Sequence, residues 1–311
     1  MVLLRWHADP VVVLGISAMA ALYLWGVQRA RNVPRSRVRC FAAAVAVLVL
    51  ALCSPVASVS EERFSVHMVQ HLLLTYGAAP LLAFSAPVTL ALQALGPGPG
   101  RKRLLSVLHS RVVRFVTHPA VTWFAFAGVM YVTHFSRLYD ASLRNPFLHG
   151  VEHLLYLGTA ALFWWPVVRR DPVPGSFPWP ARVLYLFLAM PMQSFLGVAI
   201  LNADRVLYPH YASVSGALAD QHLAGAIMWA GGDLLMLTAV GAAIAGWMRF
   251  DERETVRVDA ALDARRSAAD VARAVRGAGG RGVGERRVDD DGAVEDVRVA
   301  EELDRLGGEI R

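Results

Sequence analysis

The sequence predicts an all-α integral membrane protein, a bundle of seven transmembrane helices followed by a charged tail. Hydrophobic residues make up 55% of the 311 positions, and they form runs of about twenty, the length at which a helix crosses a bilayer. Residues 1–248 hold 18 Arg and Lys against 9 Asp and Glu, whereas residues 249–311 hold 13 against 16. We therefore expect a transmembrane domain over residues 1–250 and a cytoplasmic tail over residues 251–311.

The first three apolar segments are joined by connections of different charge. Residues 10–28 are followed by five arginines within residues 29–39, so we expect an uncleaved first helix whose N-terminus lies outside. Residues 38–57 lead to a connection in which two glutamates outnumber one arginine, which should lie outside. Residues 66–95 contain two prolines and exceed the roughly 20 residues that a span needs, so this helix should kink or tilt.

The other four segments complete the alternation of charge. They cover residues 120–135, 149–168, 181–201 and 222–248. Taken together, the connections expected inside are richer in arginine and lysine than those expected outside, so the positive-inside rule places the N-terminus outside and the C-terminus inside. The tail has no strong apolar period and alternates charges. We expect it to be mostly disordered, with a weak Ala-rich helix near residues 256–276.

Two short stretches repeat one pattern, a pair of histidines four residues apart with a polar residue just before the second. They are His67-Met-Val-Gln-His71 and His149-Gly-Val-Glu-His153. On a helix this spacing places both imidazoles of a pair on one face. Each stretch opens an apolar segment, so the two pairs should meet near one membrane surface. Stacked imidazoles in an apolar helix need partners, which favours a metal site over isolated side chains.

Other residues on the outer side are candidate ligands as well. The topology places eight of the ten histidines there, and among them His134 and His222 join the two pairs. Met68 and Met192 offer thioethers on the middle or outer parts of helices, although a methionine in a membrane helix is more often a packing residue. Imidazole together with thioether suits copper, and Cu(I) especially.

Five polar residues are expected to orient ligands or to hold helices, namely Gln70, Glu152, Asp220, Gln221 and Asp233. Glu152 and Asp233 are the two carboxylates expected inside spans, where an acid is costly and usually functional. Glu152 can orient a histidine. A structural contact with Gln193, or with a serine or threonine, is an equally good explanation of Asp233. Asp220 stands where it can cap the last helix.

Six motifs resemble, in order, those of the CtaG family of cytochrome c oxidase assembly factors, over roughly residues 5–250. The motifs are His67-Met-Val-Gln-His71-Leu-Leu-Leu, Leu138-Tyr-Asp, Leu148-His-Gly-Val-Glu-His153-Leu-Leu, Phe163-Trp-Trp-Pro166, Gln193-Ser-Phe-Leu-Gly197 and Asp220-Gln-His-Leu-Ala-Gly225-Ala-Ile-Met-Trp229. The resemblance implies a multi-pass protein of the bacterial plasma membrane that is not an enzyme.

The same resemblance implies a role in maturing a haem-copper oxidase by delivering or inserting copper. Expected partners are the oxidase subunits and an extracytoplasmic copper carrier, besides the lipid bilayer. Carried over by position, His67, His71, His149 and His153 fall in the motifs associated with the metal. The position of His222 varies within its motif, so the resemblance does not support His222 as a ligand.

Two other functions remain open on the sequence. A haem-binding membrane cytochrome would use histidines of different helices as axial ligands. His149-x-x-Glu152-His153 also matches the H-x-x-E-H pattern of zinc proteases, with Glu152 as general base. No glutamate follows Glu152 until Glu252, so a downstream third ligand is missing. Nucleic-acid binding is not expected, because the net charge of +6 belongs to the membrane part.

Overall fold

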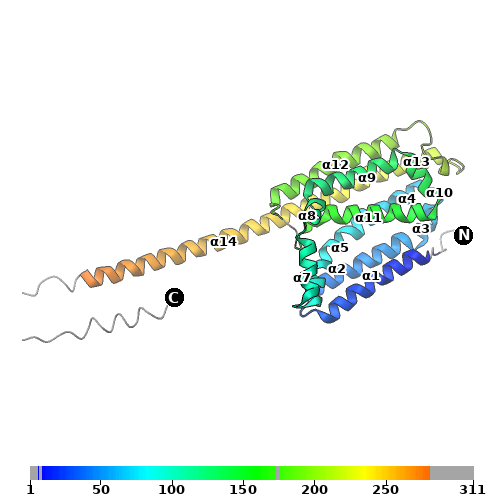
Figure 1. Cartoon of the computed structure of the whole chain (residues 1–311). Coiled ribbons are helices and arrows are strands. Elements are labelled where there is room, and N and C mark those ends of the chain that lie inside the picture. The colour runs from blue at the N-terminus through cyan, green and yellow to red at the C-terminus, as the bar shows by residue number, and fades with distance from the viewer. Residues whose placement is uncertain (1–5, 7–8, 173–174, 281–311) are drawn as a thin grey trace, which may run out of the picture. The chain divides into compact units, whose positions relative to one another are not determined.

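Among the described residues of the computed structural model, which are 6, 9–172 and 175–280, every regular element is a helix. The chain divides into two compact units, Met1–Arg249 and Phe250–Arg311. Within the first unit the long helices run alongside one another (Figure 1). Five helices are long and apolar enough to cross a membrane, and they cover Pro10–Arg29, Phe64–Leu95, Pro146–Val168, Trp179–Leu201 and Ala217–Arg273. The expected all-helical class is confirmed.

The two other expected spans are present as shorter or more polar helices. Helix α2 (Arg35–Leu52) has three arginines among its first five residues, and α9 (Pro119–His134) has 16 residues. Both nevertheless pack inside the bundle, α2 against α5 and α9 against α11 and α12. The count of seven spans and the inside–outside topology stay predictions.

The segment that carries the first histidine pair is divided into four parts. They are α4 (Phe64–Leu72), the π-helix η2 (Leu73–Ala78), α5 (Ala79–Ser85) and α6 (Pro87–Leu95). The expected interruption is present, because Ala86 adopts a left-handed conformation with φ 52° immediately before Pro87. In η2 the wider turn changes the backbone pairing, and the indole N–H of Trp164 donates to the carbonyl of Thr75 at 2.8 Å.

Small residues allow α12 (Trp179–Leu201) and α13 (Ala217–Ala226) to pack backbone against backbone. A Cβ at Gly225 would lie 2.5 Å from the amide nitrogen of Leu201, and a Cβ at Gly197 would lie 2.7 Å from that of Trp229. A side chain at either position would therefore push the helices apart. Close approach at glycine is the usual way in which membrane helices associate, because lipid gives no hydrophobic drive between them.

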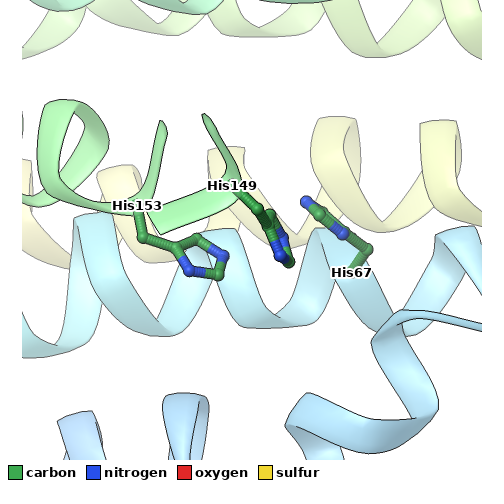
Figure 2. Close-up of side chains that lie close together, drawn as sticks. All are labelled: His67, His149 and His153. Atoms are coloured by element: carbon green, nitrogen blue, oxygen red, sulfur yellow. The ribbon is translucent and has the colours of Figure 1, made fainter. Parts of the chain in front are cut away.

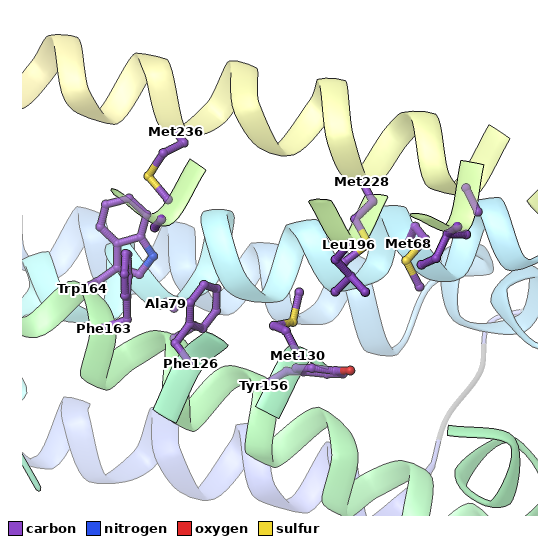
Figure 3. Close-up of a cluster of buried hydrophobic side chains, with 14 of the residues drawn as sticks. Met68, Ala79, Phe126, Met130, Tyr156, Phe163, Trp164, Leu196, Met228 and Met236 are labelled. Atoms are coloured by element: carbon purple, nitrogen blue, oxygen red, sulfur yellow. The ribbon is translucent and has the colours of Figure 1, made fainter. Parts of the chain in front are cut away.

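A buried hydrophobic cluster joins α4, α9, α11 (Pro146–Val168), α12, η4 (Ile227–Gly231) and α14 (Gly232–Gly280). Figure 3 shows Met68, Met130, Met228 and Met236 among its aromatic and aliphatic side chains. Met68 is fully enclosed there. Methionines fill irregular gaps in such cores.

The remaining short helices lie in the connections. They are α3 (Pro55–Ser60), α7 (Pro99–Leu108), α8 (Arg111–Val116), α10 (Arg137–Arg144) and the 3₁₀ turn η3 (Pro209–Tyr211). Figure 1 shows α3 and α10 at the end of the bundle near the N-terminus and α7 at the opposite end. The expected basic loop is thus largely helical, with α7 and α8 carrying its charges.

The second unit begins inside α14, which continues to Gly280. The helix expected near residues 256–276 is present, and it is longer than expected because it follows the last span without a break. Ion pairs three residues apart, such as Arg273–Asp270 at 3.0 Å, support it along the surface. Residues 281–311, to which the expectation of disorder also applied, lie outside the described residues.

Candidate metal site

Five histidines from three helices converge at one end of the first unit. His67 and His71 lie on α4, His134 ends α9, and His149 and His153 lie in the first two turns of α11. The ring centroids of His67 and His149 are 5.4 Å apart, those of His71 and His134 are 6.0 Å apart, and those of His71 and His153 are 6.1 Å apart. These five residues are called the histidine cluster below.

Two overlapping groups of side chains within this region have the spacing of metal ligands. One group is His67, His149 and His153, shown in Figure 2, and the other is His67, His71 and Glu152. Within each group the potential ligand atoms all lie within 4.8 Å of one another. The predicted meeting of the two histidine pairs is thus present, and His67 belongs to both groups.

The closest approach in the cluster is between the two histidines of α4. The Nε2 atoms of His67 and His71 are 2.8 Å apart, and both side chains are buried. Nitrogens that bind one tetrahedral ion at about 2.0–2.1 Å are about 3.3 Å apart. At this distance the two nitrogens share a hydrogen bond, so one of them carries a proton. Both can bind one ion only after that proton has left and one ring has shifted slightly outward.

Neighbouring groups determine which nitrogen of two histidines carries the proton. The hydroxyl of Tyr211 donates to the carbonyl of Ser60 at 2.9 Å, so its oxygen accepts from Nδ1 of His67 at 3.3 Å. In the same way, Nδ1 of His134 donates to the carbonyl of Met130 at 2.8 Å. Both histidines thereby keep an Nε2 lone pair, the state in which imidazole binds a metal. Nε2 of His134 is buried without a hydrogen-bond partner among the described residues.

Glu152 is buried beside the histidines, and only one of its two carboxylate oxygens has a hydrogen-bond partner among the described residues. Its Oε2 accepts a hydrogen bond from the hydroxyl of Ser142 on α10, and its Oε1 has no partner among the described residues. Because an unpaired buried carboxylate oxygen is costly, this atom is available either to an ion or to a histidine N–H. Glu152 is therefore a candidate ligand as well as the orienting group that the sequence predicted.

Tyrosines enclose the cluster, and the sequence analysis did not select them. The ring of Tyr139 lies 5.0 Å from that of His134 and 5.4 Å from that of His67. Tyr208 donates to the carbonyl of His134 at 3.2 Å. Burial raises the pKa of the Tyr139, Tyr208 and Tyr211 phenols, so these groups stay neutral. The one signal in the sequence was the motif Leu138-Tyr-Asp, which contains Tyr139.

A cavity of about 250 Å³ reaches the cluster from the end of the first unit. His149 and His153 line it, together with Asp9 and Glu61. Gln70 also lines the cavity, and its amide donates to the carbonyl of Ala51 at 2.8 Å while its Oε1 has no described partner. Charged and polar side chains line the cavity beside apolar ones, and its volume is large enough for several water molecules, so it can give a metal ion access to the two histidines of α11.

Three predicted ligands do not belong to the cluster. Met68 packs into the hydrophobic cluster although it follows His67 directly, because the next residue on a helix faces another direction. Met192 lines a separate small pocket with Met130. Nε2 of His222 lies 3.1 Å from the carbonyl of Ala203 and donates to it.

The expectation that Asp220 caps the last helix is wrong. Asp220 lies inside the first turn of α13, and its carboxylate accepts from the backbone N–H of Ser65 at 3.2 Å and from the Ser65 hydroxyl at 2.6 Å. It therefore caps the helix that carries His67 and His71, rather than its own helix. A carboxylate at a helix N-terminus is stabilised by the unpaired N–H groups and the helix dipole.

Gln221 and Asp233 have structural partners. The side chain of Gln221 accepts from the N–H of Leu207 at 2.7 Å and donates to the carbonyl of Arg205 at 3.0 Å, which holds the preceding loop. Asp233 accepts from the hydroxyl of Ser194 at 2.6 Å, one of the contacts considered for it from the sequence. Neither belongs to the two groups of potential metal ligands.

The fold and the site together define an all-helical protein with several helices able to cross a membrane and a buried histidine cluster near one end of its bundle. Residues 21–250 match the family of cytochrome c oxidase caa3 assembly factors, Caa3_CtaG, and the chain belongs to that family. The resemblance found in the sequence motifs is thereby confirmed.

Three mycobacterial relatives are similar over most of the chain. An uncharacterized protein of Mycobacterium leprae is 32% identical over 280 residues, which is 83% of this chain and 42% of the relative. Uncharacterized proteins of Mycobacterium bovis and Mycobacterium tuberculosis are each 32% identical over 278 residues, 84% of this chain and 42% of each relative. The chain thus spans less than half the length of these relatives. No solved structure matches it.

Proposed function

We propose that the histidine cluster binds copper, preferentially as Cu(I), and passes it to a haem-copper oxidase during assembly. The observation that carries this proposal is the convergence of five imidazoles, two of them with lone pairs fixed by neighbouring hydrogen bonds. Imidazole nitrogen suits copper, and the family is described as assembling an oxidase of the caa3 type. In this role the protein is a carrier and not an enzyme.

The proposed setting is the plasma membrane of a bacterium, with seven spans, the N-terminus outside and the C-terminus inside. The cluster and its cavity then open to the outer side, where an extracytoplasmic copper carrier can supply the ion and an oxidase subunit can receive it. The half-buried His149 and His153 line the cavity, whereas His67 and His71 are buried. An ion therefore meets the α11 pair first and the α4 pair second.

The two alternatives are less well supported. A haem would need space for a macrocycle between facing imidazoles, and the cavity of about 250 Å³ is below the roughly 300–1,000 Å³ of ordinary ligand pockets. A zinc protease would need a third protein ligand and an open position for water. His67 lies within ligand distance of His149 and His153. The H-x-x-E-H pattern, however, takes a downstream glutamate as third ligand, and no glutamate follows Glu152 until Glu252.

Two double variants test the proposal, His67→Leu with His71→Leu and His149→Leu with His153→Leu. Removing imidazoles from an apolar segment lowers its insertion cost, so the amount of protein in the membrane should be normal. Copper retained after loading and desalting should fall at least tenfold, and haem-copper oxidase activity should fall with it. Excess external copper should partly restore the oxidase by mass action.

The matched control is His109→Leu with His222→Leu, which removes two imidazoles outside the cluster and should leave copper content and oxidase activity unchanged. Variants of either pair that are well expressed and copper-poor yet fully competent in oxidase assembly would refute the delivery role. A purified wild-type protein that retained zinc or no metal would refute the choice of copper, and a Soret band would favour the cytochrome.

A further inference from the structure

A second site lies on the same unit at the opposite ends of the helices. It is a groove of about 760 Å³ bordered by α5, the C-terminus of α11, the N-terminus of α12 and α14 up to Arg249. His153 and Arg169 are sixteen residues apart on α11, so the groove lies roughly 24 Å along this helix from the histidine cluster. The groove is thus separate from the metal site, and nothing argued about it depends on copper.

The groove combines a basic end with apolar walls. Four arginines line it, Arg169, Arg170, Arg182 and Arg249. The rest of its surface is mainly hydrophobic and includes Phe84 of α5 and Leu235 of α14. A ligand that fits must therefore carry negative charge at one end and hydrocarbon at the other.

The four arginines have no acidic counterpart in the groove. None of them forms an ion pair with an acid within the described ranges. The acid that directly follows Arg170, Asp171, is buried, and its two carboxylate oxygens accept from the backbone N–H groups of Val88 and Thr89 at the start of α6. Asp171 is thereby occupied by another helix, and the positive charge of the groove is left for an anion.

Two of the arginines are held in place by the protein. The guanidinium of Arg182 lies 4.2 Å from the centre of the Trp179 ring and donates to the carbonyl of Phe177 at 3.0 Å. The guanidinium of Arg169 donates to the carbonyl of Gly175 at 2.9 Å. Because each guanidinium has five N–H donors, both retain donors for a ligand. The basic end is therefore partly preorganised.

Trp179 also fixes the width of the groove. A Cβ at Gly246 on α14 would lie 2.9 Å from the Trp179 ring, so glycine is needed for α14 to approach this closely. The indole is consequently clamped between α14 and the Arg182 guanidinium. Tryptophan at the end of a membrane helix is characteristic of the level of the lipid headgroups, which places the arginines at the depth of phosphate.

We propose that this groove is a binding site for an anionic phospholipid, with the phosphate at the arginines and an acyl chain along the apolar wall. Basic pockets between membrane helices at the cytoplasmic face bind such headgroups. A second groove, of about 690 Å³ between α1, α2, α5 and α6, has no charged residue in its lining. That groove should take acyl chains without preference for the headgroup and provides an internal comparison.

The test uses the full-length protein in detergent and titrates phosphatidylglycerol against phosphatidylcholine, with bound lipid counted by native mass spectrometry. The wild type should retain phosphatidylglycerol in preference. The double variant Arg170→Gln with Arg249→Gln removes two exposed positive charges. Neither arginine forms an ion pair with an acid among the described residues. Each arginine near an anionic surface strengthens binding about fivefold, so the loss of two should weaken phosphatidylglycerol binding roughly 30-fold.

The matched control is Arg111→Gln with Arg114→Gln, two exposed arginines of α8 outside the groove, which should change lipid binding less than twofold. Inorganic phosphate at millimolar concentration should not displace the lipid, because the apolar wall contributes to binding. Equal retention of the two lipids by the wild type, or equal losses in the two double variants, would overturn the proposal. Complete displacement by inorganic phosphate would also overturn it, in favour of a free-anion site.

Discussion

At the scale of single residues, His134 and His222 show how the surroundings decide what an imidazole can do. His134 is the last residue of α9 and His222 lies inside α13, and each donates one N–H to a backbone carbonyl. His134 points its other nitrogen into a buried space beside His71 and Tyr139, where that nitrogen has no described partner. His222 does not belong to the histidine cluster. Of these two histidines, only His134 is therefore expected to bind copper.

This difference can be measured with single substitutions. His134→Leu should weaken Cu(I) binding at least tenfold, because it removes a nitrogen from a site of few ligands. His222→Leu should leave the affinity unchanged within the error of the measurement. Competition with a Cu(I) chelator of known affinity gives both values on purified protein. Equal affinities in the two variants would exclude His134 from the site and leave its Nε2 as a structural group.

At the scale of elements, α4 depends on a cap from a distant part of the chain. Asp220 on α13 holds the first turn of α4 through the backbone and the hydroxyl of Ser65, and α13 is itself pressed against α12 at Gly225. The position of the His67–His71 pair is consequently coupled to the packing of α12 and α13. The cap is the contact at which this coupling can be broken without touching a ligand.

Asp220→Ala is therefore expected to act on both stability and copper. Hydrogen bonds to a charged group contribute about 1.5–3 kcal/mol to folding, so the thermal midpoint in detergent should fall, and Cu(I) affinity should fall with it as α4 shifts. The control is Asp204→Ala, which removes an exposed carboxylate in the loop before α13. A stable Asp220→Ala protein with wild-type affinity would show that the cap does not position the histidines.

At the scale of the whole molecule, the two ends of the helical bundle differ in charge and in chemistry. The histidine cluster and its cavity lie at the end near the start of α1, since Asp9 lines the cavity. The basic helices α7 and α8 lie in a connection at the other end, and the proposed lipid site lies between α5, α11, α12 and α14 toward that end. A membrane protein with this distribution should keep the basic end inside the cell.

Reporter fusions test this orientation directly. Fusions after Arg114 and after Arg170 should be active with a cytoplasmic reporter, and a fusion after Arg144 should be active with an extracytoplasmic one. A fusion after Arg249 should agree with the first two. The reverse pattern would place the histidine cluster inside, where it could not receive copper from an extracytoplasmic carrier.

Local properties of the chain could be predicted from the sequence. Most apolar runs became helices close to the expected limits, for example α11 at Pro146–Val168 and α12 at Trp179–Leu201, because the length of a run and the hydrogen bonding of its own backbone determine a helix. The run over residues 66–95 is an exception, because it is divided into four helical parts. The pairing of His67 with His71 has the same origin, since residues four apart share a face of one helix. The length of α14 was underestimated, because its polar surface is helical through local ion pairs and not through an apolar period.

The arrangement between helices could not be predicted, because it depends on which faces pack together. The sequence offered His134 and His222 as further candidate ligands beside the two histidine pairs, and packing brought His134 to the cluster and left His222 at a loop carbonyl. The same packing placed the Met68 side chain in the hydrophobic cluster. It also brought Tyr139 beside the histidines and Asp220 to the start of α4. The sequence by itself determined the helices and the two histidine pairs, since these follow from interactions within four residues. The tertiary structure decided the site, since its members meet only when distant helix faces exclude solvent and lipid together.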